Sequence, residues 1–115
     1  MGGVLSSDPK NPRLEMLRSF AEKRPEDPFP RYALAMELKT SGAGEAAWRE
    51  FESLIAEHTD YIASYAPAGE VLTGLGRLHE ARALYGRGIE ACTRRSDTHT
   101  RDHLEAALDA LGPDN

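Results

Sequence analysis

The apolar residues of the chain form two stretches that share one pattern. In each stretch, apolar side chains recur at helical spacing, a Gly-containing break follows, and a second apolar stripe continues at the same spacing. The breaks lie at residues 41–44 and 74–76. Each stretch therefore predicts two helices joined by a short turn. The apolar positions are Tyr32, Ala35, Met36, Leu38, Ala47, Phe51, Leu54 and Ile55 in the first stretch, and Val71, Leu72, Leu78, Ala81, Leu84, Tyr85 and Ile89 in the second.

The two stretches match when the sequence is shifted by 34 residues. Self-similarity at a fixed period of this length is typical of repeat proteins. We therefore expect two full repeats, over residues 28–61 and 62–95. The matched pairs are Ala35 with Gly69, Leu38 with Leu72, Gly42 with Gly76, Ala47 with Ala81, Phe51 with Tyr85, Ile55 with Ile89 and Thr59 with Thr93.

The pattern extends in both directions as half-repeats. A helix over residues 12–24 is expected to turn Leu14, Leu17, Phe20 and Ala21 inward. A capping helix over residues 97–111 begins at the N-cap residue Asp97 and ends before Gly112-Pro113, with Leu104, Ala107, Leu108 and Leu111 inward. Residues 12–111 then form one domain between a flexible leader (1–11) and a flexible tail (112–115). Because repeat arrays need about three units and atypical ends, the half-repeats would serve as caps.

The turn and packing residues resemble the tetratricopeptide repeat (TPR) family. Its pattern of a turn Gly, then Ala, then an aromatic residue is present as Gly42, Ala47 and Phe51, and again as Gly76, Ala81 and Tyr85. The resemblance implies an all-α, right-handed α-solenoid of antiparallel helix pairs, with about six helices. Thr59 and Thr93 replace the family's closing Pro, and Arg31 stands where an aromatic residue is usual. The excess of Arg over Lys suggests a small bacterial-type member.

Pro67 conflicts with a continuous first helix in the second repeat. Inside a helix, proline removes a backbone hydrogen bond and clashes with the preceding turn, at about 3 kcal/mol. Gly69 and Gly74 weaken the same helix further. Either the helix kinks at Pro67, or it starts late.

The resemblance also implies a partner-binding surface, formed by the first helix of each repeat. An aromatic and Met wall opposite small residues would suit an apolar side chain or a partner helix; the alternative is that a terminal helix covers this wall as core. The family's carboxylate clamp for chaperone tails is absent, since Tyr32, Met36 and Pro67 occupy its places. The expected lining residues are Phe29, Tyr32, Ala33, Met36, Lys39 and Thr40 from the first repeat, and Ala63, Ala66, Pro67, Glu70 and Thr73 from the second.

Charge and composition narrow the partners. The net charge of −5 argues against nucleic acid, because phosphate binding needs a basic surface. No apolar stretch approaches the roughly 18 residues that span a bilayer, so no membrane partner is expected. The single cysteine, Cys92, excludes an internal disulfide and favours the cytoplasm and a place in the core. Gly2 and Ser6 formally fit a myristoylation pattern, but a flexible Gly/Ser leader is the favoured interpretation.

Few residues suggest chemistry. His99 and His103, four apart on the predicted last helix, are weak candidates for a metal site; a solvated helix face is the favoured interpretation. No nucleophile, phosphate-loop or nucleotide-binding motif is present, so neither enzymatic activity nor a cofactor is expected. Trp48 is either an exposed binding anchor or, as we favour, packed against the next repeat.

The sequence thus predicts a non-enzymatic module that binds a protein or peptide in an apolar concave groove. Two alternatives stay open. One is a self-associating structural unit, a weak homo-oligomer whose end helices stack on those of a neighbour. The other is a metal-binding protein that uses His99 and His103.

Overall fold

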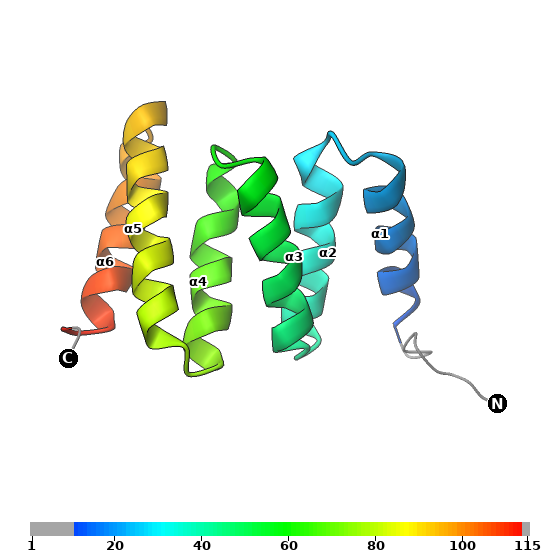
Figure 1. Cartoon of the computed structure of the whole chain (residues 1–115), viewed down its shortest axis with the longest axis horizontal. Coiled ribbons are helices and arrows are strands. Elements are labelled where there is room, and N and C mark those ends of the chain that lie inside the picture. The colour runs from blue at the N-terminus through cyan, green and yellow to red at the C-terminus, as the bar shows by residue number, and fades with distance from the viewer. Residues whose placement is uncertain (1–10, 114–115) are drawn as a thin grey trace.

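A computed structural model describes residues 11–113 of the chain. Over this range there are six α-helices, one short 3-10 turn and no strand, which confirms the predicted all-α fold (Figure 1). Most of the leader, with Gly2 and Ser6, and the last two residues of the tail lie outside the described range. The elements are α1 (Pro12–Lys23), α2 (Pro28–Thr40), α3 (Gly44–Glu57), η1 (Ile62–Ser64), α4 (Tyr65–Gly74), α5 (Leu78–Arg95) and α6 (Thr98–Ala110).

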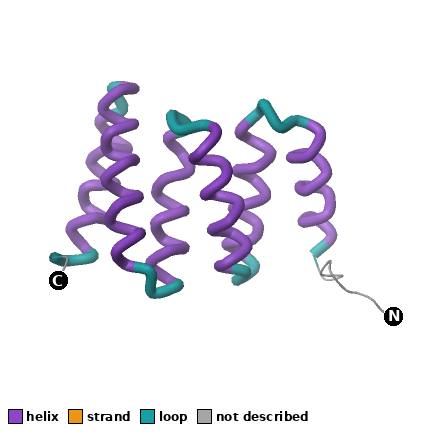
Figure 2. Tube along the Cα trace, viewed as in Figure 1, coloured by secondary structure: helices purple, strands orange, loops and turns teal. Residues whose placement is uncertain are grey.

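The helices form a row in which successive helices run in opposite directions (Figure 2). The described part of the chain is a slab of 48 × 31 × 19 Å, and each helix packs mainly against its neighbours along the chain. In Figure 1, α3 passes in front of α2 and α5 in front of α6. One broad face of the slab is therefore built from α2, α4 and α6, and we call it the A face. Within residues 11–113, no helix is long and apolar enough to cross a membrane.

Three glycines end helices in the left-handed region of backbone space, which side chains other than Gly rarely adopt. Gly42, Gly76 and Gly112 have φ values of 86°, 79° and 77°. The N–H of each donates to the carbonyl three residues earlier. Gly42 and Gly76 keep the predicted 34-residue spacing, but Gly112 follows Gly76 by 36 residues. The third unit is displaced because α5 has 18 residues where α3 has 14.

Pro67 is accommodated by a late helix start, one of the two predicted alternatives. A 3-10 turn at Ile62–Ser64 precedes α4, and Pro67 is the third residue of that helix. The first N–H groups of a helix have no partner within the helix, so a proline there removes no backbone hydrogen bond.

The core forms one continuous cluster of side chains between the helices. Phe51 and Leu72, paired by the 34-residue shift with Tyr85 and Leu38, are fully buried, and their counterparts are at most 3% exposed. Trp48 is buried, which confirms the favoured interpretation that it packs against the next repeat; the Arg77 guanidinium lies over it, 5.9 Å from its ring centre. One sequence-based expectation is wrong. Phe20 is 48% exposed rather than inward, because Leu14, Leu17 and Ala21 already fill the face of α1 that meets α2.

Helices α4 and α5 approach each other closely at Gly69. A Cβ atom added to Gly69 would lie 2.2 Å from a carbon of the Tyr85 ring. Gly69 lies seven residues before the turn glycine of its repeat, Gly76. The residue at the same distance before Gly42 is the buried Ala35 of α2, and the one before Gly112 is the exposed Glu105 of α6. A glutamate at this position is too large for another helix to approach α6 as closely as α5 approaches α4.

The end of α6 is fixed to α5 by one side chain. The Arg82 guanidinium donates hydrogen bonds to the carbonyls of Leu111, Gly112 and Pro113, at 3.2, 3.2 and 2.9 Å. The chain that follows α6 is therefore held against α5 as far as Pro113.

Candidate functional site

An aromatic group covers the beginning of α2 on the A face. The carboxylate of Asp27 accepts the N–H of Phe29 at 3.0 Å and caps the helix, which leaves Phe29 59% exposed in its first turn. The ring of Tyr32 lies 6.4 Å from that of Phe29 and 5.6 Å, edge-on, from that of Tyr61. Met36 packs beside them, half-buried against the core. Of the predicted lining residues, Phe29, Tyr32 and Met36 are thus brought together.

Helix α1 extends this apolar surface. Arg13 pairs with Glu37 at 3.2 Å, which places the stripe of α1 that contains Arg13 beside α2. Met16 and Phe20 follow Arg13 on the same stripe, three and seven residues later. Because α1 and α2 run in opposite directions, Phe20 lies level with the beginning of α2, where Phe29 is exposed.

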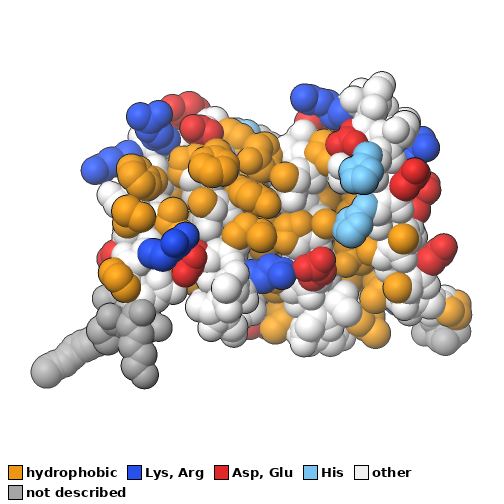
Figure 3. All heavy atoms as spheres, turned by 180° about the vertical axis from the view of Figure 1, so that it is seen from behind, with side chains coloured by type: hydrophobic (Ala, Val, Ile, Leu, Met, Phe, Trp, Pro, Cys, Tyr) orange, Lys and Arg blue, Asp and Glu red, His pale blue; other side chains and the backbone are white. Residues whose placement is uncertain are grey.

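Met16, Phe20, Phe29, Tyr32 and Tyr61 together are called the aromatic patch here. Figure 3, which shows the A face, has hydrophobic side chains gathered over its N-terminal end. Met16 is 51% exposed and Phe20 48%. Neither residue was predicted from the sequence to lie on this surface: Met16 had no predicted role, and Phe20 was expected to face the core. Their spacing of four residues places them on one side of α1 but does not tell which way that side faces.

An ion pair crosses the middle of the A face. Lys39 Nζ lies 3.1 Å from Glu70 Oε1 and so joins α2 to α4. Both residues were predicted to line the groove. Glu70 is exposed and Lys39 partly so, and such pairs contribute only about 0–1 kcal/mol to stability. The pair also makes the centre of this face nearly neutral.

The C-terminal end of the A face is hollowed between α4 and α6. This C-terminal hollow has a volume of about 620 Å³. Most of its lining is apolar or small, and Thr73, whose hydroxyl donates to the Gly69 carbonyl at 2.8 Å, turns its polar atom toward its own helix. A smaller hollow of about 350 Å³ adjoins it at the end of α2. The C-terminal hollow is lined by Glu70, Thr73, Gly74, Tyr85, His103, Ala106, Ala107, Ala110 and Leu111.

The remaining predicted lining residues contribute less. Ala63 is exposed in η1, while Ala66 and Pro67 are half-buried in the first turn of α4. Ala33 is half-buried and Thr40 exposed on α2. Whether any of these residues binds a partner stays a prediction.

The ionisable groups near the A face include the partly buried Tyr61 and two exposed histidines of α6. Burial raises the pKa of Tyr61, and the neighbouring Tyr32 and Asp27 act in the same direction. The Tyr61 hydroxyl therefore stays neutral at physiological pH. His99 and His103 are both exposed on α6. Among residues 11–113, no three potential metal-ligating side chains come together.

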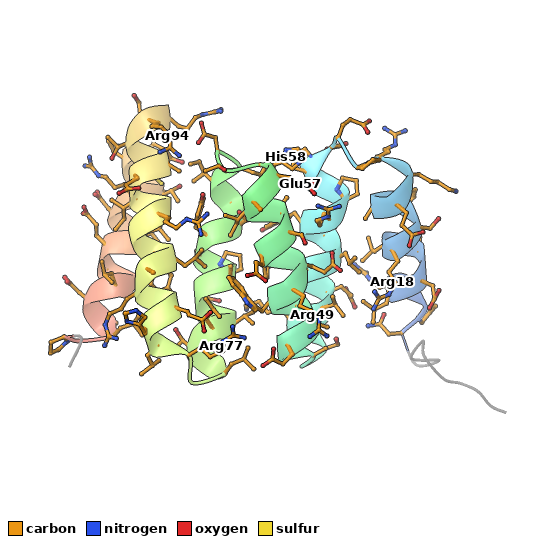
Figure 4. The ribbon with its side chains drawn as sticks, in the orientation of Figure 1. Arg18, Arg49, Glu57, His58, Arg77 and Arg94 are labelled. Atoms are coloured by element: carbon orange, nitrogen blue, oxygen red, sulfur yellow. The ribbon has the colours of Figure 1, made fainter. Side chains whose placement is uncertain are left out.

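The opposite face is strongly charged. Figure 4 shows Arg49, Glu57, Arg77 and Arg94 on α3 and α5 or beside them. Arg77 bonds Glu80 at 2.6 Å and Arg94 bonds Asp60 at 2.8 Å. Exposed apolar side chains, by contrast, concentrate on the A face: in the described chain, three of the four large exposed hydrophobic residues belong to the aromatic patch.

Solved structures of other proteins resemble this fold. A tetratricopeptide repeat domain protein from Salinibacter ruber, solved in solution by NMR, is 32% identical with a TM-score of 0.72, over 76% of this chain and 89% of that one. A crystal structure of such a protein from the same organism gives 30% identity and a TM-score of 0.70, over 74% and 94%. The chain belongs to the tetratricopeptide repeat family. No family profile and no curated protein matches this TPR sequence.

Membership of the TPR family supports a protein-interaction repeat module in general terms. It also explains why the helices pair as they do: Gly42 and Gly76 close the turns, and the small residues Ala35 and Gly69 allow each helix pair to approach closely. Fold membership alone does not identify the binding surface of this TPR protein. That assignment has to come from the side chains of its own A face.

Proposed function

We propose that the protein is a non-enzymatic, cytoplasmic interaction module that holds an apolar peptide or helix of a partner protein on its A face. The observation that supports this most is the aromatic patch. Met16, Phe20 and Phe29 are each about half exposed, and the antiparallel packing of α1 on α2 places them at the same end of the A face. Contiguous apolar surface on an otherwise charged protein is typical of interaction sites.

Tyr32 is the proposed anchor of the site. Its ring lies between those of Phe29 and Tyr61, and it is already partly desolvated by packing on the core. Truncation of such an aromatic anchor typically weakens binding by 2 kcal/mol or more, which is roughly 30-fold in the dissociation constant. Lys39 and Glu70, which pair with each other, are expected to affect mainly the association rate and its salt dependence.

Site-specific photo-crosslinking in cells of the source organism tests the surface directly. A photoreactive residue at position 29 should capture a partner that the same residue at position 78 does not. Leu78 is a matched control, because it is 40% exposed but begins α5, away from the patch. With the captured partner purified, Tyr32→Ala should weaken binding about 30-fold and retain the circular dichroism spectrum of the wild type.

Two results would contradict the proposal. Equal capture at positions 29 and 78 would mean that the A face is not the binding surface. A folded Tyr32→Ala variant that binds normally would move the site to another face. If Tyr32→Ala unfolds the protein, Phe29→Asp replaces it in the binding assay, since Phe29 is 59% exposed and contributes little to the core.

A further inference from the structure

The A face carries an exposed apolar patch and a recess at opposite corners. The aromatic patch is exposed at the beginning of α2, while the C-terminal hollow lies between the second halves of α4 and α6. The patch presents large apolar side chains. The floor of the hollow presents small ones, chiefly Ala106, Ala107 and Ala110. Shape and polarity therefore match between two parts of the same surface.

We infer that a second copy of this chain docks on the A face, so that the aromatic patch of each copy enters the C-terminal hollow of the other. A two-fold axis in the plane of the contact exchanges the patch and the hollow when it crosses the line that joins them at its midpoint and at a right angle. Both contacts then form at once and the assembly closes as a dimer. Phe29, the most exposed of the large hydrophobic side chains in the described chain, is the leading residue of each contact.

The area favours this reciprocal arrangement over patch-on-patch stacking. A whole aromatic side chain offers about 200 Å², so exposures of 59%, 48% and 51% at Phe29, Phe20 and Met16 leave about 300 Å² accessible. Patch-on-patch contact would bury about 600 Å² in total, which is within the range of incidental contacts. When each copy also covers the smaller surface of the other copy's hollow, the total rises to roughly 900 Å², which exceeds most incidental contacts and suits a weak association.

Charge is compatible with such a dimer but keeps it weak. At the centre of the face, Lys39 and Glu70 neutralise each other, and Arg13 pairs with Glu37 beside the patch. Each copy nevertheless has a net charge of −5, so two copies repel each other at long range. With an interface of this small size, we expect a dissociation constant on the order of 10–100 µM. Salt should strengthen the association by screening the repulsion.

This inference does not rest on the proposed function, although both use the aromatic patch. A second copy would cover the surface offered to a partner, so partner binding and self-association would exclude each other. Crosslinking of a partner at position 29 tests the proposed function whether or not the dimer exists. The two proposals can therefore fail separately.

Sedimentation equilibrium of the full chain is the first test. The apparent mass should rise with concentration, and more strongly at about 300 mM than at about 20 mM salt. Phe29→Asp removes the leading side chain and Ala106→Trp fills the hollow; each should raise the dissociation constant at least tenfold. Both positions are exposed, so the fold is expected to tolerate these changes. Leu78→Asp is the matched control and should dimerise like the wild type.

Mixing the two variants distinguishes the reciprocal dimer from a dimer in which patch contacts patch. A Phe29→Asp copy keeps an intact hollow, and an Ala106→Trp copy keeps an intact patch, so a mixed pair retains one of the two contacts. In NMR spectra of ¹⁵N-labelled Phe29→Asp, unlabelled Ala106→Trp should shift the amide signals of residues 106–111. Unlabelled Phe29→Asp, lacking the leading side chain, should not.

The inference is supported if both variants weaken self-association and the amide signals of residues 106–111 shift only when Phe29→Asp is mixed with Ala106→Trp. A wild type that stays monomeric up to about 1 mM at both salt concentrations overturns it, because this lies tenfold or more above the expected dissociation constant. Normal dimerisation of Ala106→Trp, or a mixture without shifts at residues 106–111, overturns it as well, because the hollow would then not receive the patch.

Discussion

Replacement of Gly69 by alanine sets two effects of opposite sign against each other. In a helix interior, alanine is favoured over glycine by about 1 kcal/mol, because glycine loses more backbone entropy on folding. Against this, the new Cβ would lie 2.2 Å from Cε1 and 2.4 Å from Cζ of Tyr85. Carbon atoms in contact prefer separations of about 3.5–4.0 Å, so the ring or the helix has to move by more than 1 Å.

The clash should prevail. Tyr85 is only 3% exposed, so its ring has no free space into which to retreat. Overpacking of a filled core typically destabilises a protein by about 1–3 kcal/mol, and the gain of about 1 kcal/mol in helix propensity offsets part of this cost. We therefore expect Gly69→Ala to lower the free energy of unfolding by up to about 2 kcal/mol.

Urea unfolding followed by circular dichroism measures this change. Gly86→Ala is the matched control, because a Cβ at Gly86 meets nothing within 4 Å and Gly86 also lies inside a helix. It should stabilise the protein by about 0.5–1 kcal/mol. The double variant Gly69→Ala/Tyr85→Leu should lose less free energy of unfolding than the two single variants lose in sum, by about 1 kcal/mol or more, because the shorter side chain removes the clash. If Gly69→Ala were as stabilising as Gly86→Ala, the close approach of α4 and α5 would be refuted.

Three further predictions concern the core, alkaline pH and the histidine pair. Phe51 is fully buried, so Phe51→Ala should lower the free energy of unfolding by about 3–5 kcal/mol in urea; a loss below about 1 kcal/mol would contradict its central place. Burial raises the pKa of Tyr65, whose hydroxyl donates to the Thr59 carbonyl at 2.6 Å. The neutral Tyr65 hydroxyl therefore stabilises the folded protein fully below the unfolded pKa of about 10, and this stabilisation is lost as the pH rises through the folded pKa. A titration should show the rise in tyrosinate absorbance together with a loss of the helical circular dichroism signal. His99→Ala combined with His103→Ala should change stability by less than about 0.5 kcal/mol, whereas tight zinc binding that the double variant loses in calorimetry would establish a metal site.

The period of the apolar pattern was enough to predict the helices, because each turn depends on a few local residues. Gly42 and Gly76 fix the 34-residue spacing through their positive φ angles. The longer spacing of 36 residues between Gly76 and Gly112 could not be predicted from the period of the pattern. It arises because Arg94 and Arg95 continue α5, where Asp60 at the corresponding place in the first repeat favours a turn.

The site was predictable only in part, for a geometric reason. Tyr32 and Met36 lie four apart on a helix whose inward face was already identified, so their direction followed. On α1, five apolar residues occur within eight positions, more than one face can bury. Only the contact between Arg13 and Glu37 shows that Met16 and Phe20 turn toward the A face.

The hydrogen bonds of Arg82 make the two ends of the row of helices differ in their resistance to mechanical unfolding. A planar guanidinium that holds three successive carbonyls closes the C-terminal end, where the exposed oxygens of α6 also carry partial negative charge. At the other end of the described chain, α1 buries only Leu14 and Ala21, and its polar links to α2 are the contacts of Glu37 with Arg13 and Asn11. In an array whose units contact only their neighbours, opening starts at the weaker end. Tension applied along the row in an optical trap should therefore peel α1 from α2 before α6 leaves α5, and Arg82→Ala should remove this order.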